Sequence, residues 1–242
     1  MTTAVVGLLI FLAALLYSSV GHAGASGYLA AMALCGVDAA TMKPTALVLN
    51  ILVAAIATVQ FRRAGCFSWP LFWPFAVVSA PCAYLGGTIA PAVFYKPVVG
   101  VVLIYASYRM LRSASSAPAA LREIPLALAL FLGAGIGLLS GLTGVGGGIF
   151  LSPLLLILRW AEPRRTAGVS AAFIFVNSLA GLLGHLSNPV SLPEALPWWA
   201  LAAVVGGTIG STYGSRRLGG PSLRRLLAGV LVIAGAKLLL AV

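Results

Sequence analysis

Acidic residues are nearly absent from this sequence. The 242 residues include four Asp and Glu against fifteen Lys and Arg, and charged residues make up 8% of the chain. A soluble domain carries roughly a quarter charged residues, because water must solvate much of its surface. The shortage excludes an ordinary water-soluble fold.

The few carboxylates also lie outside the long apolar runs, at Asp38, Glu123, Glu162 and Glu194. Carriers that couple to protons or cations commonly place a carboxylate within the membrane, so a cation exporter of that kind is disfavoured. The sequence has no legible Ser, His and acid constellation and no metal-ligand spacing. We therefore expect no enzyme activity, no metal site and no cofactor.

Cysteine is equally scarce. Cys35, Cys66 and Cys82 are odd in number and lie in or beside apolar stretches, where cysteine behaves as a small hydrophobic residue. This pattern excludes a disulfide framework and a zinc site. The first twenty residues lack the basic start of a secretory signal, so we predict a first transmembrane segment and a mature chain that begins near Met1.

Apolar residues dominate what is present. They make up 61% of the chain, and the mean hydropathy is +1.07, so lipid is the expected solvent for most of the surface. The net charge of +11 is spread singly or in pairs between apolar runs. This scatter argues against a nucleic-acid partner and is typical of cytoplasmic loops in membrane proteins.

About twenty apolar helical residues cross the roughly 30 Å core of a bilayer, and this length divides the chain into two sets of segments. The first set is expected at Thr3 to Val20, Tyr28 to Gly36, Pro44 to Phe61, Leu71 to Ala90 and Pro97 to Leu111. The second is expected at Ile124 to Leu142, Ile149 to Leu158, Thr166 to His185, Trp198 to Ser215 and Leu223 to Ala241. The second segment of each set is short and follows glycines, so 8 to 10 segments are expected in the membrane.

We therefore predict an all-α polytopic membrane protein with an N-terminal repeat over 1–111, a cytoplasmic linker over 112–123 and a C-terminal repeat over 124–242. If every segment crosses once, all arginines fall on the cytoplasmic side, whereas Lys43, Lys96 and Lys237 lie toward the outside. Both termini then lie outside. Because each half has an odd number of segments, the halves form inverted-topology repeats.

Short matches between the halves support the repeat. Gly86-Gly87-Thr88-Ile89 recurs as Gly206-Gly207-Thr208-Ile209, both in the fourth segment of their half. The stretch Gly24 to Leu29 corresponds to Gly146 to Leu151, and a helix with a polar start follows each. For the paired glycines of the first match we expect close helix packing.

Glycine clusters interrupt the chain at matching places in the two halves. Gly141 to Gly148 holds five glycines in eight residues, and Gly21 to Gly27 holds three in seven. Neither is a stiff helix, because each glycine costs roughly 1 kcal/mol against alanine there. In transporters with inverted repeats such breaks meet near the midplane and form the binding site. The free N–H groups where helices restart, near Tyr28 and Ile149, favour an anion.

The predicted substrate-binding residues come from the glycine clusters and from the polar starts of the helices that follow. They are Gly24, Ser26, Gly27, Lys43, Thr45, Asn50, Gly144, Gly146, Gly147, Gly148, Thr166, Ser170 and Asn177. For the hydroxyl and amide side chains, capping and interhelical hydrogen bonds are the alternative. His22 is a candidate for coupling, because histidine in a membrane segment is expensive and can relay protons. His185 is expected to be structural, and Pro44 to be the first residue of its helix.

Four stretches of the chain resemble the TauE/SafE family of membrane proteins, described as sulfite exporters. They are Met42-Lys-Pro-Thr-Ala-Leu-Val-Leu-Asn50, Arg62-Arg-Ala-Gly65, Gly141-Leu-Thr-Gly-Val-Gly-Gly-Gly148 and Arg164-Arg-Thr-Ala-Gly-Val-Ser-Ala171. The resemblance covers nearly the whole chain. It implies a bacterial cytoplasmic-membrane transporter with two repeated halves that exports a sulfur oxyanion or an organosulfonate. The first-half stretch Gly21 to Gly27 departs from the family pattern, since it is poorer in glycine.

We therefore expect a multi-pass protein of the bacterial cytoplasmic (inner) membrane that acts as a secondary transporter. It would export a small anion, sulfite or an organosulfonate, by alternating access around the paired breaks. An anion channel that uses the same glycines as a filter is the alternative, and an intramembrane enzyme or a non-transporting scaffold are further classes. The expected partners are a small anionic substrate and the lipid bilayer, with homo-oligomers left open.

Overall fold

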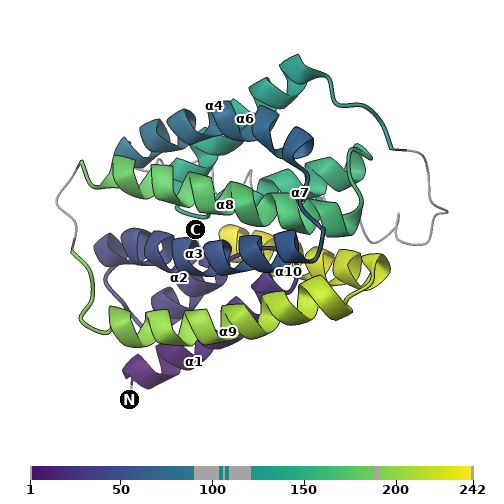
Figure 1. The fold of residues 1–242 in the computed structure, drawn as a ribbon. Coiled ribbons are helices and arrows are strands. Elements are labelled where there is room, and N and C mark those ends of the chain that lie inside the picture. The colour runs from purple at the N-terminus through teal and green to yellow at the C-terminus, as the bar shows by residue number, and fades with distance from the viewer. Residues whose placement is uncertain (1, 90–103, 106, 109–120, 188–190, 241–242) are drawn as a thin grey trace.

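The computed structural model describes residues 2–89, 104, 105, 107, 108, 121–187 and 191–240 (Figure 1). The helices in these ranges are α1 (Thr2–Ser18), α2 (Ala25–Leu34), α3 (Ala39–Arg63), α4 (Trp69–Thr88), α6 (Leu126–Thr143), α7 (Gly148–Ile157), α8 (Pro163–His185), α9 (Leu196–Arg217) and α10 (Gly220–Leu240). The predicted all-α class is confirmed over these residues. The segment predicted over 97–111 and most of the linker over 112–123 lie outside the described residues.

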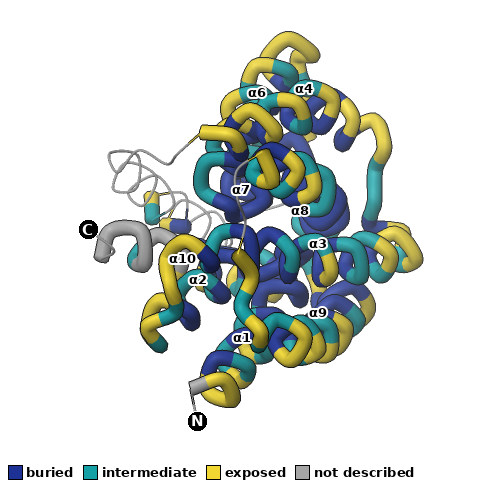
Figure 2. The backbone as a smooth tube through the Cα atoms, turned by 90° about the vertical axis from the view of Figure 1, so that its left-hand side faces the viewer, coloured by how far each residue is buried: buried dark blue, intermediate teal, exposed yellow. Residues whose placement is uncertain are grey.

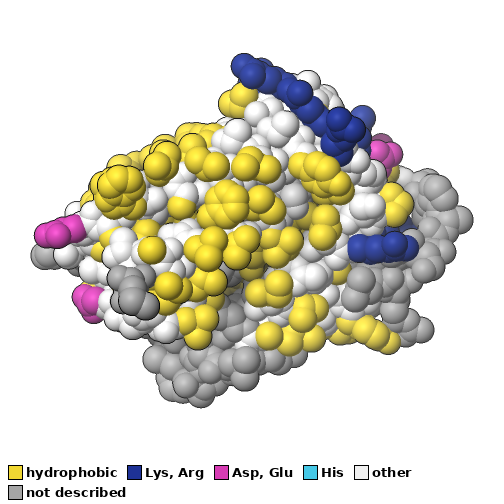
Figure 3. Space-filling view, turned by 90° about the horizontal axis from the view of Figure 1, so that it is seen from below, with side chains coloured by type: hydrophobic (Ala, Val, Ile, Leu, Met, Phe, Trp, Pro, Cys, Tyr) yellow, Lys and Arg dark blue, Asp and Glu magenta, His cyan; other side chains and the backbone are white. Residues whose placement is uncertain are grey.

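Several of these helices suit a bilayer. Four of the described helices, α3, α4, α6 and α8, are long and apolar enough to cross one, whereas α1, α2 and α7 are apolar but shorter. Large apolar side chains point outward, and Phe131 and Trp198 are 76% and 70% exposed. Figure 3 shows one face covered by such side chains, with Lys and Arg gathered toward one end. This is the surface of a protein whose middle is solvated by lipid.

The two short helices, α2 and α7, begin alike. Each is ten residues long and follows a glycine in the left-handed conformation, Gly24 with φ 109° and Gly147 with φ 79°. Glycine adopts this conformation without a Cβ clash, so the chain can change direction immediately before each helix.

The two short helices also end alike. The residue two places beyond each helix has a positive φ, 70° at Gly36 and 59° at Arg159. The following amide donates back to the carbonyl of Met32 in α2 and of Leu155 in α7. This closure is the Schellman motif, which favours glycine at the left-handed position.

The start of α3 differs from the prediction that Pro44 is its first residue. The helix begins at Ala39, because Asp38 caps it by accepting a hydrogen bond of 3.3 Å from the Ala40 amide. Pro44 therefore lies inside the helix, where its missing N–H leaves the Ala40 carbonyl without a helical donor. The prediction for Pro44 was wrong.

Helices from the two sequence halves interleave. In Figure 1, α4 and α6 lie at the top, α8 and α7 below them, then α3 and α2, and α9 and α1 at the bottom. The main contacts join α4 to α6 and α8, α1 to α9, and α3 to both α8 and α9. Thus α9 of the second half packs on first-half helices, and α4 of the first half packs on second-half helices.

Glycine contacts fix the directions within each group. Gly133 and Gly141 of α6 lie against Phe75 and Ala83 of α4, in the same order along both helices. These two helices therefore run parallel. Tyr84 of α4 lies against Gly184 of α8, and Val176 of α8 lines one groove with Val77 of α4, so α8 runs parallel to them as well.

The helices α1, α3 and α9 run the other way. Gly206 and Gly210 of α9 lie against Phe11 and Leu15 of α1, so α1 and α9 are parallel. The start of α8 meets the end of α9, where Arg164 donates to the Ser215 carbonyl (2.6 Å), so these two are antiparallel.

The α3 and α8 helices are also antiparallel. Asn50 lies by Ser178, and Cys66, just past α3, lies by Gly168 near the start of α8. Hence α1, α3 and α9 point one way, and α4, α6 and α8 point the other way.

The matched glycine pairs of α4 and α9 occupy matched contacts. Gly86 faces α6 and Gly87 faces α8, whereas Gly206 faces α1 and Gly207 faces α3. A Cβ atom at Gly86 would stand 2.4 Å from the Leu138 carbonyl oxygen, and one at Gly206 would stand 2.4 Å from the Phe11 carbonyl oxygen. The close packing predicted for these glycines is confirmed.

The most buried part of the molecule lies where α3, α7 and α8 meet, as Figure 2 shows. Polar side chains are part of it, because Thr45, Asn50, Thr166, Ser170 and Asn177 are all fully buried. Buried polar groups are costly unless they are hydrogen-bonded, so their concentration here marks the place to look for a site.

Candidate functional site

The first break joins α1 to α2 through residues 19–24. It holds two left-handed glycines, Gly21 with φ 78° and Gly24 with φ 109°. A Cβ atom at Gly21 would stand 2.2 Å from the carbonyl oxygen of Ala167 in α8. Only glycine lets the break lie this close, so a first-half loop packs directly on a second-half helix.

The second break joins α6 to α7 through residues 144–147. Gly144, Gly146 and Gly147 have φ angles of 72°, 82° and 79°. A Cβ atom at Gly144 would stand 2.9 Å from Cγ of Lys43 in α3. This second-half break therefore packs on the first-half helix α3, just as the first-half break packs on the second-half helix α8.

Gly146 occupies the tightest part of the second break. A Cβ atom there would stand 2.7 Å from Cγ2 of Ile174, 2.8 Å from Oγ of Ser178 and 2.9 Å from Nδ2 of Asn50. The Asn50 amide lies 3.3 Å from both the Val145 carbonyl oxygen and the Ser178 hydroxyl, and donates to each. Asn50 thus ties α3 to the break and to α8.

His22 brings the two breaks together. Its Cδ2 lies 3.5 Å from the Cβ position of Gly148, the first residue of α7. Its Nδ1 lies 3.3 Å from the Val20 carbonyl oxygen, and its Nε2 lies 3.3 Å from the Ser152 hydroxyl. Ser152 is in turn 2.7 Å from the Ser170 hydroxyl. His22 is only 1% exposed. The hydrogen-bonded chain of His22, Ser152 and Ser170 is therefore buried, and it links the first break to α7 and α8.

Three predicted residues of α8 share one face of that helix. Thr166, Ser170 and Asn177 are four and seven residues apart, the spacing of side chains on one helix face. The Asn177 amide donates to the carbonyl of Phe173 in its own helix (2.8 Å), but Oγ1 of Thr166 and Oδ1 of Asn177 have no partner. Buried polar atoms are normally satisfied, so this stripe has spare hydrogen-bonding capacity.

Lys43, Leu47 and Asn50 are four and three residues apart on α3, so they share one face, which meets the second break. Thr45 is two residues from Lys43, so its side chain lies on the other side of the helix. Thr45 is fully buried, and its hydroxyl also lacks a partner.

The predicted residues of the first break lie in a different setting. Gly24 lies under the ring of Tyr28 in its own helix, and a Cβ atom at Gly27 would stand 2.7 Å from the Ala13 side chain of α1. The Ser26 hydroxyl donates to the Tyr17 hydroxyl (2.9 Å). In these contacts Ser26 and Gly27 join α2 to α1, and Gly24 packs on Tyr28 of α2.

Sequence reasoning missed two members of the cluster, Ser152 and Ser178. Ser152 is the one hydroxyl residue in the otherwise apolar α7. That isolation is a usable signal, because a hydroxyl in such a segment needs a hydrogen-bond partner. Ser178 carries no such mark, since its partner Asn50 is 128 residues away.

Charged side chains gather at the ends of the helices. α3 ends at Arg62 and Arg63, α9 ends at Arg216 and Arg217, and α8 begins near Arg165. Because α8 is antiparallel to the other two, all these arginines lie at one end of the molecule. The chain's four acids are exposed, so no carboxylate lies within the buried polar cluster.

Comparison with known proteins identifies the family. Residues 6–238 match the family model described as sulfite exporter TauE/SafE. The chain belongs to this family. A relative from Sinorhizobium fredii, named probable membrane transporter protein y4hK, is 44% identical over 246 residues, which cover 99% of this chain and 100% of the relative.

Two more distant relatives carry similar names. The probable membrane transporter protein MJ0441 of Methanocaldococcus jannaschii is 24% identical over 210 residues, 81% of this chain and 78% of its own. The probable membrane transporter protein YunE of Bacillus subtilis is 28% identical over 108 residues, 43% of this chain and 38% of its own. No solved structure matches the chain. The TauE/SafE resemblance and the membrane-transporter class are confirmed.

Proposed function

We propose that this TauE/SafE protein is a secondary transporter that exports a small anion by alternating access around its two glycine breaks. The proposal rests chiefly on the contact of His22 with Gly148, through which breaks from opposite halves meet in a buried polar cluster. Irregular backbone at membrane depth persists only where protein or a wet cavity satisfies it. Paired breaks are also the way in which inverted-repeat transporters build a central site.

We infer that the halves, 1–111 and 124–242 joined by the linker 112–123, are inverted repeats. Equivalent helices would be α1 and α6, α2 and α7, α3 and α8, and α4 and α9. Exchanging each helix for its equivalent turns the contact of α1 with α9 into that of α6 with α4, and the contact of α3 with α9 into that of α8 with α4. Equivalent long helices also run in opposite directions, as an inverted repeat requires.

The moving bodies would then be two groups of interleaved helices rather than the two sequence halves. One group is α1, α3 and α9, and the other is α4, α6 and α8. Within each group, glycines bring backbones so close that a single methyl would clash, as at Gly141 and Gly210. Between the groups, α3 and α8 meet in mid-helix through side chains such as Leu47, 3.8 Å from the Cβ position of Gly181, while a close backbone contact, Gly168 with the Cys66 carbonyl just past α3, lies at the arginine end. Side-chain contacts can repack, whereas backbone contacts of this kind hold two helices together.

The cargo is an anion because the buried cluster offers donors and no fixed negative charge. The Thr166 hydroxyl has no partner and can donate, the Ser170 hydroxyl shares a hydrogen bond with Ser152, and the second break frees the first N–H groups of α7. An oxyanion accepts several such bonds at once. The family description as sulfite exporter supports sulfite and organosulfonates as the first candidates.

The predicted roles of Lys43 and His22 remain part of this proposal. Lys43 lies beside Gly144, away from the arginine end, and would attract the anion as it leaves. His22 is the titratable member of the chain that includes Ser152 and Ser170. Protonation there would offset part of the cargo's charge, which couples transport to protons.

We propose that the protein lies in the bacterial cytoplasmic membrane, with the arginine end facing the cytoplasm and both termini outside. A cysteine-accessibility map tests this orientation. The loops at Arg63 and Arg165 are expected on the same, cytoplasmic face, and labelling from opposite faces would reject the topology.

Purified protein in liposomes tests the function itself. We expect saturable efflux of sulfite or of a small organosulfonate, changed by a pH gradient in the wild type and insensitive to it in His22→Gln. A planar bilayer separates the alternatives, because a channel conducts a steady current and a carrier does not. A steady current would replace the carrier by the channel, and absence of flux for every anion tried would reject transport.

A further inference from the structure

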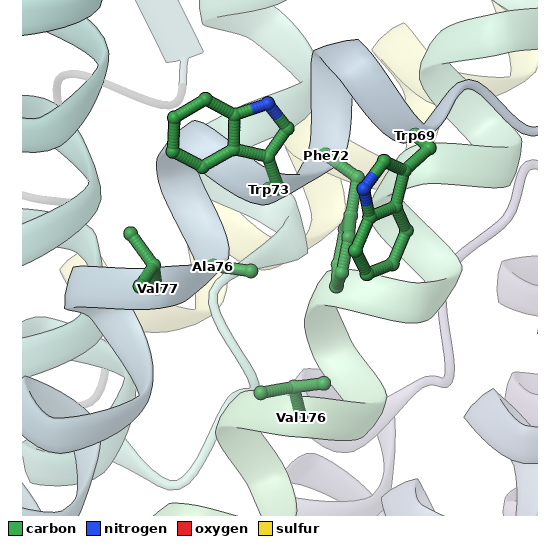
Figure 4. A pocket seen from close by; sticks show the side chains of 6 residues that line it. All are labelled: Trp69, Phe72, Trp73, Ala76, Val77 and Val176. Carbon is green, nitrogen blue, oxygen red and sulfur yellow. The ribbon is translucent and has the colours of Figure 1, made fainter.

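An apolar groove opens on the outer surface between α4 and α8. It has a volume of about 540 Å³ and is lined by Trp69, Phe72, Trp73, Ala76, Val77 and Val176 (Figure 4). Trp73 stands on one side of it and the Trp69 and Phe72 rings on the other. Trp69 and Val77 are 62% and 57% exposed, whereas Phe72 and Ala76 are buried. The groove is therefore an open trough with a packed floor.

The position of the groove places it in lipid near one membrane surface. Both α4 and α8 are long and apolar enough to span a bilayer, so water is not the solvent that fills the trough. Trp69 is the first residue of α4, and tryptophan is typical of the boundary between acyl chains and headgroups. The groove therefore runs from that boundary toward the bilayer midplane.

Exposed arginines lie at the same end of the helices as Trp69. Arg62 and Arg63 close α3 a few residues before Trp69, and Arg165 is in the first turn of α8. Arg165 precedes Val176 by eleven residues, which is three helical turns and places both on one face, about 16 Å apart along the axis. Half of a bilayer's hydrocarbon core is about 15 Å thick. The distance from Arg165 to Val176 along α8 thus matches the distance from a lipid phosphate to the inner part of its acyl chain.

We propose that this groove binds an anionic phospholipid, with one acyl chain between Trp69, Trp73 and Val176 and the phosphate held by Arg62, Arg63 and Arg165. Arginine binds phosphate oxygens through paired hydrogen bonds. A zwitterionic lipid would bring its own cation toward these arginines and gain less. A second copy of this chain is a poor fit, because four acids in 242 residues leave few carboxylates to face three arginines.

Quenching of tryptophan fluorescence by brominated lipid tests the proposal on the full-length protein. Both series use vesicles of phosphatidylcholine and phosphatidylglycerol. The bromine label is on phosphatidylglycerol in the first series and on phosphatidylcholine in the second. The quenching that arises in the groove is the quenching of wild type minus that of the double variant Trp69→Phe/Trp73→Phe. We expect brominated phosphatidylglycerol to be preferred by about fivefold for each arginine that meets the headgroup.

Arginine variants locate the headgroup. Arg62→Gln/Arg63→Gln and Arg165→Gln are expected to lower the preference by at least about fivefold. Arg216→Gln/Arg217→Gln removes two charges at the same end but on α9, and should leave the preference unchanged. Equal quenching by the two lipids, or an unchanged preference in the α3 and α8 variants, would overturn the proposal. Quenching that is identical in wild type and Trp69→Phe/Trp73→Phe would also overturn it, because the groove would then be closed to lipid, as a second copy would close it.

Discussion

Single residues of this protein matter chiefly through backbone conformation. Both breaks depend on glycines with positive φ, and Gly146 in the second break has φ 82°. A residue with a Cβ atom loses roughly 1–2 kcal/mol in that conformation. Arg159 adopts it nevertheless, with φ 59°, at the end of α7 where Gly36 closes α2. Both positions close a short helix with the same backbone conformation, one with a glycine and the other with an arginine.

Opposite substitutions at these positions should therefore have opposite effects. Gly36→Ala is expected to destabilise by about 1 kcal/mol, because no atom lies within 4 Å of its Cβ position and only the backbone strain changes. Arg159→Gly is expected to stabilise by a similar amount, since it removes that strain. Thermal unfolding in detergent measures both. Shifts of the same sign would contradict the equivalence of the two helix ends.

The sequence predicted the breaks better than the cluster around them. Glycine counts located both breaks, because few residues other than glycine tolerate a left-handed turn before a helix. The hydrogen bonds between residues far apart in the chain could not be predicted from the sequence around either partner. Asn50 bonds to Ser178, and His22 lies beside Ser152, over 128 and 130 positions of sequence. Gly27 stays a predicted site residue, and the contact described for it is with Ala13 of α1.

At the scale of helices, the lengths of apolar runs predicted where the helices lie, while the choice of neighbours was not predictable. Trp198 to Ser215 was predicted and α9 spans Leu196–Arg217, because length and apolarity are local properties. The helix α3 begins five residues before Pro44, because Asp38 caps it, and this cap was not predicted from the sequence. The α9 helix packs on α1 because its glycines share one face and the α1 backbone fits against that face. The identity of the helix that fits there is not a local property of the α9 sequence.

Glycine contacts between α4 and α6 allow a test at this scale. A Cβ atom at Gly141 would stand 2.0 Å from the Ala83 carbonyl oxygen, whereas no atom lies within 4 Å of the Cβ position of Gly135. Gly141→Ala should destabilise by about 1–3 kcal/mol through overpacking. Gly135→Ala, on the same helix, should be neutral or stabilise by up to about 1 kcal/mol. Equal melting temperatures for the two variants would show that the α4 and α6 contact is looser than described.

At the scale of the whole molecule, motion of the two interleaved helix groups can be distinguished by experiment from motion of the two sequence halves. If α3 and α8 separate during transport, a bridge between them should stop it. The pair Leu47→Cys and Gly181→Cys, joined by a short bifunctional thiol reagent in a background without the native cysteines, should abolish flux, and cleavage of the bridge should restore it.

The matched control lies within one group. The pair Val53→Cys and Gly207→Cys joins α3 to α9, where the Cβ position of Gly207 is 3.4 Å from Cβ of Val53, close to the separation in a disulfide. This bridge should leave flux unchanged. Normal flux with the α3 and α8 bridge in place would refute the proposed motion.

The central claim is that the two glycine breaks together form the transport site, and flux through a Gly146 variant tests it most directly. Sulfite and sulfonate efflux is measured from liposomes that hold equal amounts of inserted, monodisperse wild type, Gly146→Leu and Gly135→Leu. We expect Gly135→Leu to transport like wild type and Gly146→Leu to lose about 100-fold, because the new side chain displaces Asn50 and Ser178. Wild-type flux through Gly146→Leu would contradict the account.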